Sequence, residues 1–180
     1  MTVIISIDSL TKQYGDKIVL NGISFTIEQG EIFALIGTNG AGKTTALECI
    51  EGLRKYSGTI EVHGKMGVQL QSTSLPGNIK IKEALKLFAK WNGTTLDTGL
   101  IQRLNLEPMM NKKYNELSTG QKRRLHLVLA MVGEPDIVFL DEPTAGLDVE
   151  GRVALHEEIR ALKQRGKTIV LTSHDRVEVE

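Results

Sequence analysis

Residues 37–44, Gly-Thr-Asn-Gly-Ala-Gly-Lys-Thr, constrain the fold of this chain more than any other stretch. They follow the apolar run 32–36 and lead into the amphipathic segment 45–50, so we expect a strand, a glycine-rich turn and a helix in this order. Gly40 and Gly42 have no Cβ, which lets backbone N–H groups point inward at an anion. Together with the positive end of the following helix, this stretch predicts a cradle for a polyphosphate.

Two side chains at the end of the same stretch fit a nucleoside triphosphate. Lys43 would reach the β- and γ-phosphates, and the Thr44 hydroxyl would bind the Mg²⁺ that bridges them. The alternative is a glycine-rich turn without function. The apolar strand before the turn and the amphipathic segment after it favour phosphate binding, because the motif requires that context.

The bulk composition narrows the class of protein. A chain of 180 residues is expected to form one compact domain. Lys+Arg and Asp+Glu are both 22, and this balance argues against a protein whose main role is to grip nucleic acid. Cys49 is the only cysteine, which excludes an internal disulfide, and we expect it to pack in the core. We find no signal peptide and no apolar run near the ~18 residues of a membrane span.

The periodicity of apolar residues changes along the chain. Alternating segments near the amino terminus predict antiparallel strands, with turns at 14–16 and 21–22. Later segments alternate between helices and β-branched runs, which predicts a parallel sheet covered on both faces. The expected strands are 3–8, 17–20, 23–28, 59–62, 66–70, 136–140 and 167–171. The expected helices after residue 50 are 81–91, 96–106 (capped by Asp97), 119–132 and 149–163.

An acidic pair follows the buried-looking strand before Pro143. Ligands bind at the carboxyl ends of strands in open α/β sheets, so Asp141 is placed to hold a hydrated Mg²⁺. Glu142 could polarise the water that attacks the γ-phosphate. The alternative, that the pair only caps a helix, is weakened by the phosphate loop on an earlier strand.

Residues 117–121, Leu-Ser-Thr-Gly-Gln, precede another helix. Ser118 is a natural N-cap, and capping alone would explain it. The functional interpretation is that Ser118 and the Gly120 amide present a second anion site. One fold cannot readily bring both helix ends to one phosphate, whereas a second copy of the chain could.

These residues resemble the ATP-binding subunits of ABC transporters, and the stretch 67–72 is similar to that of the exporter-type subunits. The resemblance runs from Ser6 to His174 and includes seven motifs in order. The matched motifs are the adenine-stacking aromatic Tyr14, Walker A 37–44, the Q-loop glutamine Gln71, the signature 117–121, Walker B 137–142, the D-loop 145–148 and the switch histidine His174. The implied fold is α/β: a P-loop NTPase core with a mostly parallel sheet, an N-terminal antiparallel β subdomain and a small helical subdomain at about 78–133, within one domain spanning 1–180.

The resemblance also implies a role for each matched residue. Tyr14 would stack on the base of ATP, and the phosphates would be wrapped by Gly37, Thr38, Asn39, Gly40, Ala41, Gly42, Lys43, Thr44 and Thr45. Gln71 and Asp141, with Thr44, would complete the shell of Mg²⁺ and water. Glu142 would activate the water, and His174 would contact the γ-phosphate. Ser118 and Gly120 would close over the ATP of a partner subunit.

The implied activity is ATP hydrolysis that powers transport. Two chains, identical or homologous, would dimerise head to tail on ATP and act on a membrane permease at the cytoplasmic face of the cell membrane. No nucleic-acid partner is expected. The alternative is a soluble ABC-type ATPase without a permease, acting on DNA, ribosomes or cluster assembly. A P-loop kinase or GTPase is disfavoured by the signature motif, and an inactive fragment is disfavoured by intact Lys43, Glu142 and His174.

The chain departs from the family pattern at three places. Thr119 stands where glycine is usual, residues 63–65 form a short connection, and the sequence stops at Glu180, before the usual C-terminal strands and helices. From the last departure we expect weaker stability and impaired hydrolysis. The basic run 122–124 is expected to be a solvated helix face, with contact to phosphate as the alternative.

Overall fold

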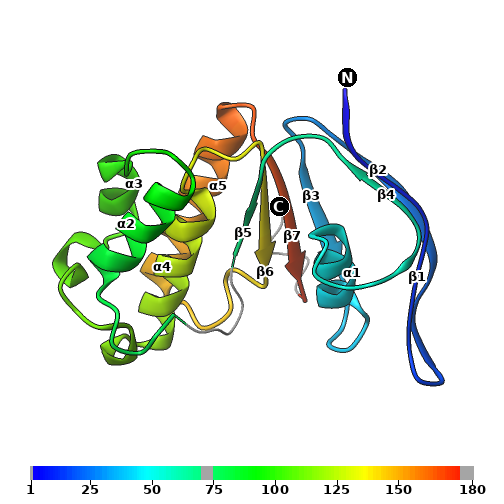
Figure 1. The fold of residues 1–180 in the computed structure, drawn as a ribbon, viewed down its shortest axis with the longest axis horizontal. Helices are drawn as coiled ribbons and strands as arrows, with labels where there is room; N and C mark the ends of the chain where they lie inside the picture. Colours follow the sequence, from blue (N-terminus) through cyan, green and yellow to red (C-terminus); the bar gives the residue numbers. More distant parts are fainter. Residues whose placement is uncertain (1, 70–74, 175–180) are drawn as a thin grey trace.

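The computed structural model describes residues 2–69 and 75–174, which form two sheets and the helices around them (Figure 1). A three-stranded sheet has the order β2-β1-β4, and a four-stranded sheet has the order β3-β7-β6-β5. The strands are β1 Val3–Tyr14, β2 Lys17–Glu28, β3 Ile32–Ile36, β4 Ser57–Val62, β5 Met66–Val68, β6 Ile137–Asp141 and β7 Thr168–Ser173. The helices are α1 Lys43–Ile50, α2 Ile81–Trp91, α3 Thr98–Arg103, α4 Thr119–Met131 and α5 Val149–Gln164, with short 3-10 turns at Glu107–Met109 and Tyr114–Glu116.

The four-stranded sheet is parallel and is buried on both faces. Along β6, Val138 and Leu140 enter one apolar cluster with α4 and α5. Ile137 and Phe139 point the other way, into a cluster with α1 and the antiparallel sheet. Because both faces of the sheet are covered, the sequence of β6 is an unbroken apolar run up to Asp141, as predicted. Figure 1 shows α1 between the parallel strands and the antiparallel sheet, and α2 to α5 on the opposite side. The predicted α/β fold class is therefore confirmed.

The strands of the N-terminal sheet are longer than predicted, because β1 continues to Tyr14 and β4 begins at Ser57. The predicted turn at Asn21 and Gly22 is wrong, since β2 runs through it without a break. Gly22 has a φ of 65°, its N–H donates to Thr11 Oγ1 at 3.1 Å, and the pairing register with β1 shifts nearby. The Asn-Gly pair therefore forms a bulge, in which one strand carries an extra residue, and does not reverse the chain.

The helical segment after β5 is joined to the α/β core by an ion pair between exposed Arg103 and buried Glu158. The predicted cap is confirmed, because Asp97 Oδ1 accepts from Leu100 N–H at 3.1 Å at the start of α3. The helix ends earlier than predicted, at Arg103, since Asn105 adopts a left-handed φ of 52°. Arg103 Nε donates to Glu158 Oε2 of α5 at 2.7 Å, and Glu158 is only 2% exposed. Whether this segment forms a subdomain at about 78–133 stays a prediction. Among the described helices, none is long and apolar enough to cross a membrane.

Candidate functional site

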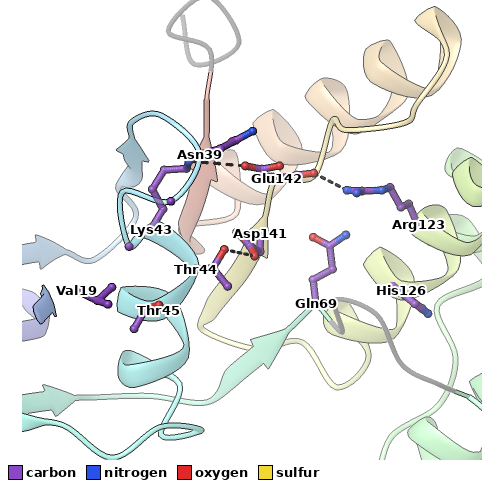
Figure 2. Close-up of a pocket in the computed structure, with 12 residues that line it drawn as sticks. Val19, Asn39, Lys43, Thr44, Thr45, Gln69, Arg123, His126, Asp141 and Glu142 are labelled. Carbon is purple, nitrogen blue, oxygen red and sulfur yellow. Dashed lines mark hydrogen bonds and ion pairs between the residues drawn. The ribbon is translucent and has the colours of Figure 1, made fainter. Parts of the chain in front are cut away.

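A cavity of about 470 Å³ lies where the carboxyl ends of the parallel strands meet the start of α1 (Figure 2). This is the edge at which ligands bind in open α/β sheets. The described residues that line it are Val19, Asn39, Gly40, Gly42, Lys43, Thr44, Thr45, Gln69, Arg123, His126, Asp141 and Glu142. The structure thus brings together the glycine-rich turn and the acidic pair, which lie about 100 residues apart in sequence.

Two glycines of the glycine-rich turn have left-handed backbone conformations. Gly42 precedes α1 as its N-cap with a φ of 92°, and Gly40 has a φ of 83°. A Cβ on Gly42 would lie 3.0 Å from the carbonyl oxygen of Val19, so the turn is packed against β2. Gly37 N–H donates to the Ser173 carbonyl at 3.3 Å, which ties the start of the turn to the end of β7. The turn is consequently fixed on both sides with its cavity face open.

Lys43 is held inside the turn by oxygen atoms of the turn itself. Its Nζ donates to the carbonyls of Gly37 at 2.8 Å and Thr38 at 3.1 Å, and lies 3.7 Å from Glu142 Oε1. The Lys43 side chain is only 8% exposed. A buried ammonium is costly unless paired, so these three oxygens account for its position. Phosphate oxygens could replace them as acceptors.

Thr44 and Asp141 form the second pair of facing side chains. Thr44 Oγ1 donates to Asp141 Oδ2 at 2.8 Å, and Figure 2 shows the two meeting beneath the turn. Asp141 Oδ1 accepts from the hydroxyl of Thr172. A hydroxyl and a carboxylate are the hard oxygen ligands that Mg²⁺ prefers, so this donor set fits that ion.

The backbone of Glu142 is held by hydrogen bonds on both sides, and its carboxylate lies near two basic side chains. Its N–H donates to Thr172 Oγ1 at 2.9 Å, and its carbonyl accepts from Arg123 Nη1 at 2.5 Å. Its Oε1 lies 3.7 Å from Lys43 Nζ and 3.9 Å from His174 Nδ1. The His174 side chain is 51% exposed, and His174 is not among the described residues that line the cavity.

Some predicted site residues lie elsewhere. Tyr14, Ser118 and Gly120 are absent from the described residues that line the cavity. Tyr14 ends β1 and has Lys12 Nζ 4.8 Å from its ring centre. Ser118 caps α4, where its hydroxyl accepts from Gln121 N–H at 3.3 Å, so the capping interpretation is confirmed. Gln71 lies outside the described residues.

The sequence interpretation missed five residues of this site: Val19, Gln69, Arg123 and His126 of the cavity lining, and Thr172, which bonds Asp141 and Glu142. The basic run 122–124 was expected to be solvated, which is wrong for Arg123, because it lines the cavity and bonds Glu142. Gln69 is 7% exposed, with an amide oxygen that has no partner among the described residues. Thr172 is fully buried. The available signal for Thr172 was a hydroxyl at the end of an apolar run, but its partner follows only from the register between β6 and β7.

The sequence as a whole matches a known family model. The family model described as ABC transporter matches residues 20–145. Nod factor export ATP-binding protein I of Burkholderia lata is 39% identical over 96% of this chain and 63% of its own length. An uncharacterised ABC transporter ATP-binding protein of Methanocaldococcus jannaschii is 39% identical over 98% of this chain and 70% of its own length. The chain thus spans less than two thirds of the Burkholderia relative.

Solved structures show the same architecture. An ATP-binding subunit of an ABC transporter superposes with a TM-score of 0.87 at 28% identity, over 95% of this chain and 79% of that one. The ADP conformation of an ATP-binding cassette gives a TM-score of 0.81 at 21% identity, over 99% and 84% of the two chains, and supports the fold alone. The family model matches more than half of the chain, and the Methanocaldococcus relative is 39% identical. The chain therefore belongs to the family of ABC transporter ATP-binding proteins.

Proposed function

We propose that this chain binds ATP and hydrolyses it to power transport by an ABC transporter. The observation that carries the proposal is the convergence of Lys43, Thr44, Asp141 and Glu142 on one cavity at the carboxyl edge of a parallel sheet. A cation, a hydroxyl and two carboxylates around a glycine-rich turn are the groups that phosphoryl transfer from a nucleotide requires. Family membership supports the same activity.

ATP binding would exchange the partners of Lys43. Its Nζ now donates to the carbonyls of Gly37 and Thr38, and phosphate oxygens of ATP would take over as acceptors. The N-terminus of α1, with its free N–H groups and positive dipole, would face the same phosphates. The Lys43 ammonium would also move away from the Glu142 carboxylate. That carboxylate would then be free to accept a proton.

Hydrolysis needs a base beside the attacking water. Glu142 would accept the proton of that water, with His174 Nδ1 as a neighbouring group 3.9 Å from Glu142 Oε1. Thr44 and Asp141 would hold Mg²⁺, which supplies positive charge at the phosphate oxygens when bound. Gln71 keeps its proposed place in the same shell, and Tyr14 its proposed contact with the base.

The second anion site would act on a partner. Ser118 is exposed at the N-terminus of α4 and lies outside the lining of this chain's own cavity. We therefore propose that Ser118 and Gly120 close over the ATP of a second ATP-binding subunit in a head-to-tail dimer. The dimer would act on a membrane permease from the cytoplasmic face. Export is the proposed direction, which the name of the Burkholderia relative supports.

Steady-state hydrolysis of Mg-ATP by purified variants tests the activity. Removal of the base in Glu142→Gln should lower the turnover at least a hundredfold while ATP still binds. Lys43→Ala should lose ATP binding itself, because phosphate charge is no longer compensated. Glu61→Gln, an exposed change on β4 outside the lining of the cavity, is the matched control and should behave as wild type. Equal turnover in Glu142→Gln and wild type would refute the assigned chemistry.

A further inference from the structure

The hydroxyl of Thr172 connects the two acidic residues of the site. Thr172 belongs to β7 and is fully buried. Its Oγ1 donates to Asp141 Oδ1 and accepts from the N–H of Glu142 at 2.9 Å. A hydroxyl has one hydrogen, so once that hydrogen is given to Asp141 only a lone pair remains for Glu142. The hydroxyl therefore acts as a donor towards Asp141 and as an acceptor towards Glu142.

Glu142 needs this support because of its backbone conformation. Its φ of 43° lies in the left-handed region, which residues with a Cβ seldom adopt. Such a conformation persists only where the surroundings fix it. Here both polar groups of the backbone are held by side chains from other elements: the N–H by Thr172 of β7 and the carbonyl by Arg123 of α4.

We propose that Thr172 is a positioning residue for ATP hydrolysis, which sets the direction of the Glu142 carboxylate and the orientation of Asp141, with Arg123 holding the other side of the Glu142 peptide. The proposal rests on the proposed function of Glu142 as the base. The connected chain is Thr44, Asp141, Thr172 and Glu142. A shift of Thr172 would thus displace both carboxylates at once. Misplacement of a reacting group by about 1 Å can lower a rate on the order of a hundredfold.

The same strand offers a matched control. Thr168 is also fully buried on β7, and its Oγ1 accepts from Gly30 N–H at 3.0 Å at the opposite end of the strand. Thr168→Val and Thr172→Val each remove one hydroxyl, keep the branched shape and leave one partly buried N–H without its acceptor. Both should lose stability, seen as a lower midpoint of thermal unfolding, and Thr172→Val should lose more because it also removes the donor to Asp141. Thr172→Ser retains the hydroxyl.

Turnover then separates positioning from stability. Thr172→Val should lower kcat by about tenfold to a hundredfold, with KM for ATP within about twofold of wild type and a raised Mg²⁺ requirement. Thr168→Val should retain kcat, and Thr172→Ser should restore most of it. A loss of kcat equal in Thr168→Val and Thr172→Val, or no rescue by Thr172→Ser, would overturn the proposal.

A crystal structure of Thr172→Val provides a readout that does not depend on activity. We expect Glu142 to leave the left-handed region or its carboxylate to turn from its wild-type direction. An unchanged Glu142 and Asp141 in that variant would contradict the positioning role even where turnover cannot be measured. Failure of the proposed function is distinct from either result: wild type would then hydrolyse ATP no faster than Lys43→Ala.

Discussion

Glu51 lies at the C-terminal end of α1, where burial is the main cause that raises the pKa of its carboxyl to about 7. The negative charges of Asp141 and Glu48 add to the shift in the same direction. Because the folded chain holds this proton more tightly than the unfolded chain, the contribution of Glu51 to stability is retained below about pH 4.5 and is lost as the pH rises towards about 7.

The Glu51→Gln variant should therefore lose this pH dependence. Its free energy of unfolding should exceed that of wild type by about 1–3 kcal/mol at pH 8, with the difference vanishing near pH 4, because the amide cannot ionise. Urea unfolding across this pH range is the measurement. Glu61→Gln, exposed on β4, should follow the wild-type curve. Parallel curves for Glu51→Gln and wild type would show that burial of the charge has no energetic effect.

Residues of the site differ in how well their positions can be predicted from the sequence. Lys43, Thr44, Asp141 and Glu142 could be predicted because their neighbours in sequence define a strand end or a helix start. The contact of Thr172 with Glu142 could not, since it depends on which residue of β7 lies beside Asp141. Arg123 was misjudged for a similar reason: a cation on a helix looks solvated until the sheet edge facing it is known.

At the scale of elements, the contact between β5 and α4 allows no side chain at Gly67. A Cβ there would lie 2.0 Å from the backbone carbonyl oxygen of Ala130 and 2.7 Å from Pro135 Cγ. Backbone atoms cannot rotate away as a flexible side chain can. Gly67 thus sets how closely the helix approaches the strand that leads to Gln69 and the phosphate cavity.

Gly67→Ala should consequently lower the free energy of unfolding by about 3 kcal/mol, since strand and helix must separate. Gly77→Ala is the control, because a Cβ at that position meets Asn115 Cβ at an ordinary 3.5 Å, and it should change stability by less than about 0.5 kcal/mol. Chemical denaturation of the two variants beside wild type tests the difference. Similar stability in both variants would mean that β5 and α4 can move apart at little cost.

Elements were predictable where periodicity and caps agree. The start of α4 after Ser118 and the apolar strand β6 both follow from local sequence. The errors came where a local signal has two structural uses. An Asn-Gly pair occurs both in turns and in bulges. The pairing of β2 with β1 shows that Gly22 lies in a bulge. The last turn of the helix after Asp97 depends on the left-handed Asn105, which apolar periodicity does not reveal.

For the whole molecule, the two helix N-termini with predicted anion sites do not line the same cavity. The start of α1 lines the phosphate cavity, whereas Ser118 at the start of α4 is exposed and outside its lining. One chain therefore presents half of the proposed composite site to solvent. The fold class follows from sequence patterns, but this arrangement required the positions of both helices.

The solution mass of Glu142→Gln with and without Mg-ATP tests the central claim most directly, because a chain that binds ATP without hydrolysing it should accumulate as the head-to-tail dimer. We expect the mass to double on addition of Mg-ATP, and Lys43→Ala, which should not bind phosphate, to stay monomeric. Glu142→Gln with an added Ser118→Arg change, which blocks the second anion site, should bind ATP and remain a monomer. A Glu142→Gln chain that binds ATP yet keeps the monomer mass would contradict ATP-driven pairing of two copies of this chain.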